Sequence, residues 1–260
     1  LNYIGEVDFF VSCCKLINRT GNGKYCFTEF IESNEPYIQC QDIWHPVIKD
    51  DSIVTNDVTL DDPRNMIITG PNAGGKSTFI KSMTLALVFS QTMGISMGTQ
   101  MKITPFRLIN TYLNIPDVSG KESLFEAEMH RAREHINKLE KMDSKDFSFF
   151  IMDEIFSSTN PEEGISGGYA ICERLGELKN SMNIITTHFN YLTRLTETGN
   201  YKAYKIPISR NENNDIVYNY KLQPGVSDQF IALELLKTKG FDKNIVSRAQ
   251  EVCDKIGKEK

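Results

Sequence analysis

Long apolar runs are missing from this 260-residue sequence. A transmembrane helix needs roughly 18 or more apolar residues in succession. The longest candidate here, "LALVFSQTMGISM", is interrupted by Ser90, Gln91 and Gly94. The first residues contain no basic segment followed by an apolar core, so we expect no secretory signal. We therefore expect a protein with no membrane partner.

An excess of basic residues is also missing. The 29 Lys and Arg are outnumbered by 34 Asp and Glu, which gives a net charge of −5. A freestanding nucleic-acid binder usually carries a basic patch and a high isoelectric point. If this chain acts on DNA, we expect most of the DNA contact to lie in domains outside it.

Cysteine pairs of the CxxC type are absent among the six cysteines. A chain of this length can build a core without disulfide bridges, so we interpret the cysteines as reduced thiols. This indicates an intracellular protein, cytoplasmic or nuclear. The histidines are scattered, and His130 and His135 are five positions apart, a spacing that does not place them on one helix face. We expect no histidine metal site.

Apolar segments that alternate between strand and helix character are present along most of the chain. We predict an α/β fold with a mainly parallel central sheet, because strands and helices alternate. Strands are predicted at 65–69, 147–152 and 183–187, and another extended segment at 101–115. Helices are predicted at 1–17, 76–92, 123–142, 162–180, 189–198, 227–238 and 242–257. A small antiparallel sheet is predicted across 24–60, and a hairpin between 201–209 and 216–222.

A phosphate-binding loop is predicted between the strand at 65–69 and the following helix. Residues 70–77 fit the pattern G-x-x-x-x-G-K-[ST], in which backbone N–H groups and a helix N-terminus surround a phosphate. Lys76 would reach the β- and γ-phosphates, Ser77 would bind Mg²⁺, and Thr78 would contact the α-phosphate. The residues of this predicted site are Gly70, Pro71, Asn72, Ala73, Gly74, Gly75, Lys76, Ser77 and Thr78.

Two further strand ends carry polar side chains. "FSFFIM" is followed by Asp153 and Glu154, of which Asp153 is placed to hold Mg²⁺ and Glu154 to polarise an attacking water. Neither N-K-x-D nor a D-x-x-G directly after this strand is present, so the pair favours ATP hydrolysis over a GTPase switch. "NIITT" is followed by His188, at the sheet edge where ligands usually bind. His188 is a candidate sensor of the γ-phosphate.

Four motifs stand in a distinctive order: "TGPNAGGKST", "SLFEAEM", "DEIFSST" and "TTH". In this order and at this spacing the chain resembles the ATPase domain of the MutS DNA mismatch-repair family. The segment "ISGGY" is similar to the LSGGQ signature of ABC-type ATPases, but it follows the Asp-Glu strand instead of preceding it. We therefore reject it in that role.

The resemblance implies a P-loop NTPase fold of the ABC type. It implies the end of a connecting clamp or lever helix over 1–20, an ABC-type ATPase domain over 21–222, and a C-terminal helix-turn-helix for dimerisation over 223–260. The ligands it implies are ATP or ADP with Mg²⁺. The implied partners are a second MutS-like subunit, in a homodimer or a heterodimer, DNA held mainly by other domains, and a MutL-like protein or a nuclease.

The resemblance also implies roles for individual residues. Glu154 would be the catalytic base, assisted by Lys76 and His188, and Ser77 with Asp153 would hold the metal. Ser123 would approach the γ-phosphate of the opposite subunit and complete its site in trans. Ile53 and Val54 are implied at the adenine, and Asn56 belongs to the same nucleotide-binding loop.

Departures from the family pattern leave open which target the protein acts on. Ala73 stands where the family usually has Met, and Phe156-Ser157-Ser158-Thr159 stands where it has G-R-G-T. We expect the target to be a DNA mismatch. The alternative is branched DNA or another target of an ABC- or SMC-like ATPase. A small-molecule kinase would need a lid rich in Arg, which we do not find. An inactive scaffold is disfavoured because Lys76, Ser77, Asp153 and Glu154 are all present.

Overall fold

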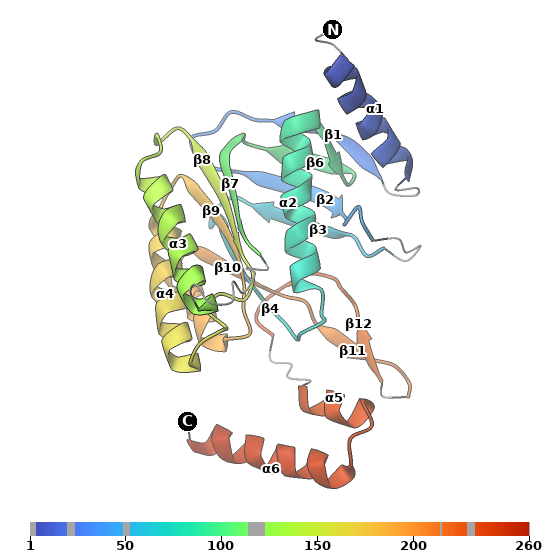
Figure 1. The fold of residues 1–260 in the computed structure, drawn as a ribbon, viewed down its shortest axis with the longest axis vertical. Coiled ribbons are helices and arrows are strands. Elements are labelled where there is room, and N and C mark those ends of the chain that lie inside the picture. The colour runs from blue at the N-terminus through green and yellow to red at the C-terminus, as the bar shows by residue number, and fades with distance from the viewer. Residues whose placement is uncertain are drawn as a thin grey trace.

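The computed structural model describes residues 4–19, 24–48, 53–113, 123–213, 215–227 and 232–259. Within them, two large sheets, one two-stranded sheet and the surrounding helices form an α/β arrangement (Figure 1). No helix in the described ranges is both long and apolar enough to cross a membrane. The mixture of sheets and helices confirms the α/β class predicted from the sequence.

The central sheet has six strands in the order β13-β10-β4-β9-β8-β7. Five of them run parallel to their neighbours, and only β13 pairs antiparallel, with β10. Every residue of β4, β8 and β9 is buried, as expected for apolar strands covered on both faces. The bounds are β4 Asn65–Thr69, β7 Phe106–Tyr112, β8 Phe147–Met152, β9 Ser181–Thr186, β10 Tyr201–Lys205 and β13 Gln223–Pro224.

The second sheet has five strands in the order β3-β2-β6-β1-β5. The small antiparallel sheet predicted over 24–60 is present in part. It differs from the prediction because β1 and β6 pair in parallel and two of its strands come from beyond residue 60. The bounds are β1 Tyr25–Phe30, β2 Ile38–Ile43, β3 Asn56–Leu60, β5 Ile95–Met97 and β6 Gln100–Ile103.

The extended segment predicted at 101–115 is present, but it is divided between two strands. The chain leaves the five-stranded sheet after β6, passes Thr104 and Pro105, and enters the central sheet as β7. Pro105 has no N–H to donate to a ladder, so a break between two strands is the favourable place for it. Residues 114 and 115 lie outside the described residues.

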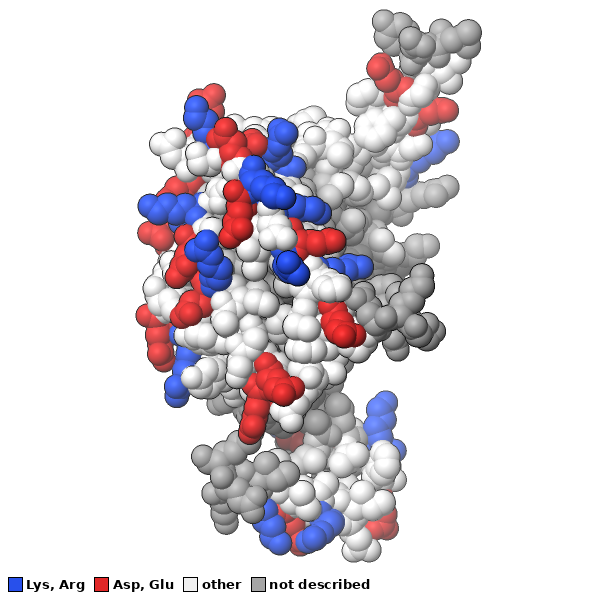
Figure 2. Space-filling view, turned by 60° about the vertical axis from the view of Figure 1, so that its left-hand side comes forward, with Lys and Arg blue, Asp and Glu red and all other residues white. Residues whose placement is uncertain are grey.

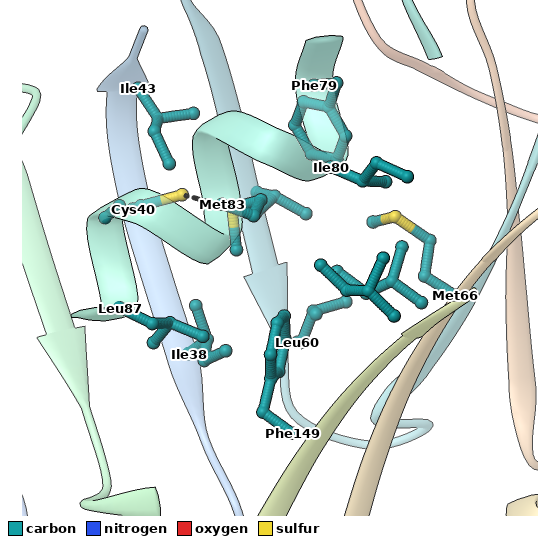
Figure 3. Close-up of a cluster of buried hydrophobic side chains, with 14 of the residues drawn as sticks. Ile38, Cys40, Ile43, Leu60, Met66, Phe79, Ile80, Met83, Leu87 and Phe149 are labelled. Carbon is teal, nitrogen blue, oxygen red and sulfur yellow. Dashed lines mark hydrogen bonds between the residues drawn. The ribbon is translucent and has the colours of Figure 1, made fainter. Parts of the chain in front are cut away.

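Helix α2 (Lys76–Met93) lies between the two sheets. Figure 3 shows its side chains Phe79, Ile80, Met83 and Leu87 among residues of β2, β3, β4 and β8. On the other face of the central sheet a second apolar cluster joins α3 (Leu124–Glu140), α4 (Pro161–Glu177) and the 3₁₀ helix η1 (Asn190–Thr198). The helix predicted at 189–198 is therefore present, but as a 3₁₀ helix.

Three peripheral elements extend from this body. Helix α1 (Ile4–Arg19) lies at one end of the molecule, and α5 (Ala232–Thr238) and α6 (Lys243–Glu259) lie at the other (Figure 1). The predicted hairpin is shorter than expected: only β11 (Ile208–Arg210) pairs with β12 (Ile216–Tyr218), because β10 joins the central sheet beside β4. The domain boundaries at residues 20 and 222 stay a prediction.

One histidine lies wholly inside the molecule, between α3 and the central sheet. The His135 side chain is 0% exposed, and its ring stacks on Phe150 with the centroids 3.7 Å apart. Its Nδ1 lies 3.0 Å from Nδ2 of Asn110. Burial disfavours the charged imidazolium and Lys138 adds a smaller repulsion, so the pKa of His135 is lowered to about 3. The folded state therefore holds this ring neutral.

Acidification should destabilise the protein through His135. The unfolded chain binds the proton near pH 6.5 and the folded chain only near pH 3, so the stabilisation is complete above pH 6.5 and is lost as the pH falls towards 3. We expect His135 to account for about 2 kcal/mol of the free energy of unfolding lost between pH 7 and pH 5. Urea unfolding of His135→Gln should show a shallower pH dependence than wild type. Equal slopes in wild type and His135→Gln would contradict the assignment.

Candidate functional site

The loop between β4 and α2 has the backbone of an anion cradle. Gly70 and Gly75 have φ of 145° and 102°, and a Cβ on Gly70 would lie 2.8 Å from the carbonyl oxygen of Ile206. Gly75 is also the N-cap of α2, and no side chain caps that helix end. The first N–H groups of α2 therefore remain for a ligand, at the positive end of the helix dipole.

Lys76 is buried at the start of α2, with a side chain 4% exposed. Its ammonium donates to the carbonyl oxygens of Gly70 at 2.9 Å and Pro71 at 3.3 Å. The Asn72 side-chain oxygen lies 3.5 Å away. These three partners are uncharged, and the carboxylate of Glu154, 3.5 Å from the ammonium, is the anionic neighbour of this buried lysine.

The turn after β8 brings the predicted carboxylates to the same edge of the sheet. Glu154 adopts a left-handed backbone with φ of 53°. Its N–H donates to the carbonyl oxygen and the side-chain oxygen of Thr186, at 3.1 and 2.9 Å. The Thr186 hydroxyl donates in turn to Oδ1 of Asp153 at 2.6 Å. The end of β9 thus fixes the turn that carries Glu154.

Glu154 links two of the predicted catalytic side chains. Its Oε1 lies 3.5 Å from Nζ of Lys76, and its Oε2 lies 3.4 Å from Nδ1 of His188. The hydrogen bond with His188, and then the charge of Lys76, lower the pKa of Glu154 against the opposing effect of burial. Glu154 is therefore ionised at neutral pH and can accept a proton or a hydrogen bond. The structure thus brings all three predicted catalytic residues together.

A cavity of about 800 Å³ opens beside this loop. That size suits a nucleotide-sized ligand. The predicted site residues that line it are Ile53, Val54, Asn56, Pro71, Asn72, Ala73, Gly75, Lys76, Ser77, Thr78 and Glu154. Gly70, Gly74, Asp153, His188 and Ser123, all within the described ranges, are not among the lining residues.

Asn56 faces the cavity, but its amide is already engaged. Its Nδ2 donates to the carbonyl oxygen of Tyr220 at 3.0 Å, and its Oδ1 accepts from the backbone N–H of Leu222 at 2.6 Å. Only 6% of the residue is exposed. The observed contacts of Asn56 are therefore with the segment after β12, which Asn56 fixes against β3.

Two tyrosines that the sequence reasoning missed complete the cavity wall. Tyr218 and Tyr220 both line it, and their rings stack with centroids 6.0 Å apart and an interplanar angle of 16°. A Cβ on Gly75 would lie 2.9 Å from the Tyr220 ring, so the ring packs on the loop itself. The spacing i, i+2 in "VYNY" placed both rings on one face, but nothing local indicated that this face meets residues 70–78. His45 was missed in the same way.

The residues present fit a magnesium ion only when a phosphate is bound beside it. Among the described residues no group of three or more His, Cys, Asp or Glu could hold a metal. The Ser77 side chain lines the cavity, and Asp153 lies at the adjacent strand end. Mg²⁺ is commonly held by one or two such oxygens together with water and substrate phosphates. This donor set matches that pattern.

Ser123 lies away from its own cavity, at the exposed N-cap of α3. Its hydroxyl accepts from the N–H of Glu126 at 3.3 Å, and the Glu126 carboxylate accepts from the Ser123 N–H at 2.8 Å and from its hydroxyl at 3.0 Å. These bonds, first from the backbone and then from the hydroxyl, lower the pKa of Glu126. The start of α3 thus holds an anionic group in the present structure.

Comparisons with known proteins place this geometry in context. Residues 66–257 match the family model of MutS domain V. The DNA mismatch repair protein MutS of Petrotoga mobilis is 30% identical over 260 residues, and the match covers 98% of this chain and 31% of that protein. The MutS of Pseudothermotoga lettingae is 29% identical over 238 residues, covering 90% of this chain and 29% of that protein. The chain thus spans less than a third of the length of these two relatives.

Proposed function

Since this chain belongs to the MutS family by its domain V, we propose that it binds ATP in the cavity beside Lys76 and hydrolyses it to ADP and phosphate. The observation that carries the proposal is the meeting of the uncapped start of α2, the buried Lys76 and the ionised Glu154 in one cavity of about 800 Å³. The fold proposed for it is that of an ABC-type P-loop NTPase.

The chemistry assigned to the chain's own residues follows from their charges. The N–H groups at residues 75–78 and the Lys76 ammonium hold the phosphates and offset the charge that develops on them. Glu154 orients a water molecule and accepts its proton as the water oxygen bonds to the γ-phosphorus and the bond to ADP breaks. His188, 3.4 Å from Glu154, holds the carboxylate in place. Mg²⁺ held by Ser77 and Asp153 would offset the phosphate charge further.

The base of the nucleotide is assigned to the apolar end of the cavity. Ile53 and Val54 line one part of it, and the Tyr220 ring lines another. An aromatic side chain offers a flat surface on which a purine can stack. Asn56 contributes by holding the backbone of Tyr220 and Leu222, which positions that ring.

Removing the Tyr220 ring should weaken ATP binding through the base alone. We expect Tyr220→Ala to lower the affinity for ATP by about 10-fold, because base stacking contributes roughly 1–3 kcal/mol. Tyr220→Phe, which keeps the ring, should bind ATP like wild type. Isothermal titration with ATP and with inorganic triphosphate separates the two parts of the ligand. An equal loss of affinity for both ligands would show instead that Tyr220 only supports the loop at Gly75.

The nucleotide site is proposed to be completed by a second MutS-like subunit. Ser123 is exposed at a helix start that already holds a carboxylate, and it lies outside the cavity of its own chain. A γ-phosphate of a neighbouring subunit would take the place of the Glu126 carboxylate there. The last helices, α5 and α6, are proposed to contribute to this pairing. Hydrolysis by unpaired chains would then be slow.

The wider role is proposed from the family. ATP-driven closure of the pair would switch a DNA clamp formed by other parts of the protein, in mismatch repair or on branched DNA, with a MutL-like protein or a nuclease downstream. On the face shown in Figure 2, basic and acidic side chains are interspersed. That distribution, with a net charge of −5, supports DNA contact mainly outside this chain. The alternative is an ABC- or SMC-like ATPase with another client.

A further inference from the structure

Helix α3 and the turn after β8 meet at a buried carboxylate that the proposed chemistry does not use. Glu128 is 5% exposed and lies on the inner face of α3, with Ala132, His135 and Leu139. Its Oε2 accepts a hydrogen bond of 2.7 Å from the hydroxyl of Ser158. Burial disfavours a carboxylate without hydrogen-bond donors, so the Ser158 hydroxyl stabilises Glu128, and the Tyr112 side chain is a second neighbour of this carboxylate.

A second contact joins the same two segments. The rings of Phe125 and Phe156 meet edge to face, with centroids 5.3 Å apart. Phe156 is 1% exposed and has a left-handed backbone with φ of 54°. Its position is fixed on the other side by α4, because a Cβ on Gly164 would lie 2.4 Å from the Phe156 carbonyl oxygen. The first two turns of α3 thus contact the turn through both polar and apolar side chains.

The turn that carries Glu154 is short and is closed by a backbone hydrogen bond. The Ser157 N–H donates to the carbonyl oxygen of Glu154 at 3.2 Å. This bond closes a turn from Glu154 to Ser157, so the proposed base is the first residue of the turn and Ser158, which contacts Glu128, directly follows its last. Ser123 lies five positions before Glu128, at the start of the same helix.

We infer that Glu128 is a positioning residue for Glu154, acting through its hydrogen bond with Ser158. Helix α3 then has two roles. Its start presents Ser123 outward to a neighbouring subunit, and its second turn sets the orientation of Glu154 in its own chain. A neighbouring subunit that engages Ser123 would thereby change the alignment of the base in the chain that it contacts. This inference rests on the proposed function, since it assigns a task relative to Glu154.

The test compares the Ser158→Ala variant with the wild-type protein. We expect kcat for ATP to fall about 10-fold, because a small misplacement of a reacting group is costly, while the Kd for ATP stays within about twofold. In hydrogen-exchange mass spectrometry without nucleotide, peptides over 124–128 and 154–158 should both exchange at least about threefold faster. Ser158→Thr keeps the hydroxyl and should restore both readouts. Ser166→Ala, which removes a hydroxyl from the exposed side of α4, is the matched control.

Glu128→Gln supplies a second, independent variant. The glutamine oxygen can still accept from Ser158, so turnover should stay within about threefold of wild type if Glu128 acts by position. Unchanged kcat and exchange in Ser158→Ala, a parallel loss of kcat and ATP affinity, or no rescue by Thr would each overturn the inference. If wild type hydrolyses no ATP, the proposed function fails as well. If wild type is active and Ser158→Ala is identical to it, only the inference fails.

Discussion

Glu154→Gln should retain ATP binding and lose turnover by at least about 100-fold, the usual effect of removing a catalytic base. The carboxylate is held 3.5 Å from Lys76 and 3.4 Å from His188, and these contacts keep it ionised beside the cavity. An amide has nearly the same shape but cannot accept the proton of a water molecule. Steady-state release of phosphate measures the loss.

The same substitution should not weaken ATP binding or the pairing of subunits. The ionised Glu154 lies in the wall of the cavity that we assign to a triphosphate. Removing that negative charge should leave the ATP affinity unchanged or raise it. With hydrolysis stalled, paired subunits should accumulate in the presence of ATP and Mg²⁺, which light scattering after size exclusion measures as a doubled mass.

An exposed carboxylate supplies the control for this change. Glu140→Gln, at the far end of α3, makes the same chemical change away from the cavity and should keep wild-type turnover. Unchanged hydrolysis in Glu154→Gln would remove Glu154 from the role of base. A parallel loss of ATP binding would show that Glu154 supports the loop through Lys76 instead.

Local patterns were sufficient to predict the parts of the fold that depend on neighbouring residues in the sequence. The strands at 65–69 and 147–152 were predicted because apolar runs bounded by turns have few other interpretations, and the structure places strands at the same residues. The loop at 70–77 was predicted because its glycines and Lys76 occupy fixed positions of a known pattern. The structure places Lys76 and Glu154 at one cavity, as that pattern and the Asp-Glu strand indicated.

Features set by tertiary pairing could not be predicted in the same way. The segment 101–115 reads as one extended run, and only the sheet partners of β6 and β7 divide it between two sheets. Tyr220 reaches the cavity because Asn56, 164 positions earlier, binds its backbone. The contact between Glu128 and Ser158 joins two segments 30 positions apart. No periodicity or motif in the sequence indicates contacts between such distant residues.

Lys76→Ala and Ser123→Ala should each abolish most ATP hydrolysis, for different reasons. Lys76 is the buried cation of the cavity, so its loss removes the charge that holds the phosphates. Ser123 is exposed and lies outside the cavity of its own chain, so its loss should spare ATP binding by single chains and impair pairing. Each variant alone should lose at least about 100-fold in turnover, as when a group that stabilises transition-state charge is removed.

Mixing the two variants tests the central claim, a nucleotide site shared between two subunits. In a mixed pair, one site combines the intact Lys76 of one chain with the intact Ser123 of the other. Half of the pairs in an equal mixture are mixed, and each has one intact site of two, so about a quarter of the wild-type rate should return. Lys76→Ala mixed with Glu154→Gln should recover nothing, because both changes fall in the same half of the site. A mixture of Lys76→Ala and Ser123→Ala that stays as inactive as its components would contradict the shared site.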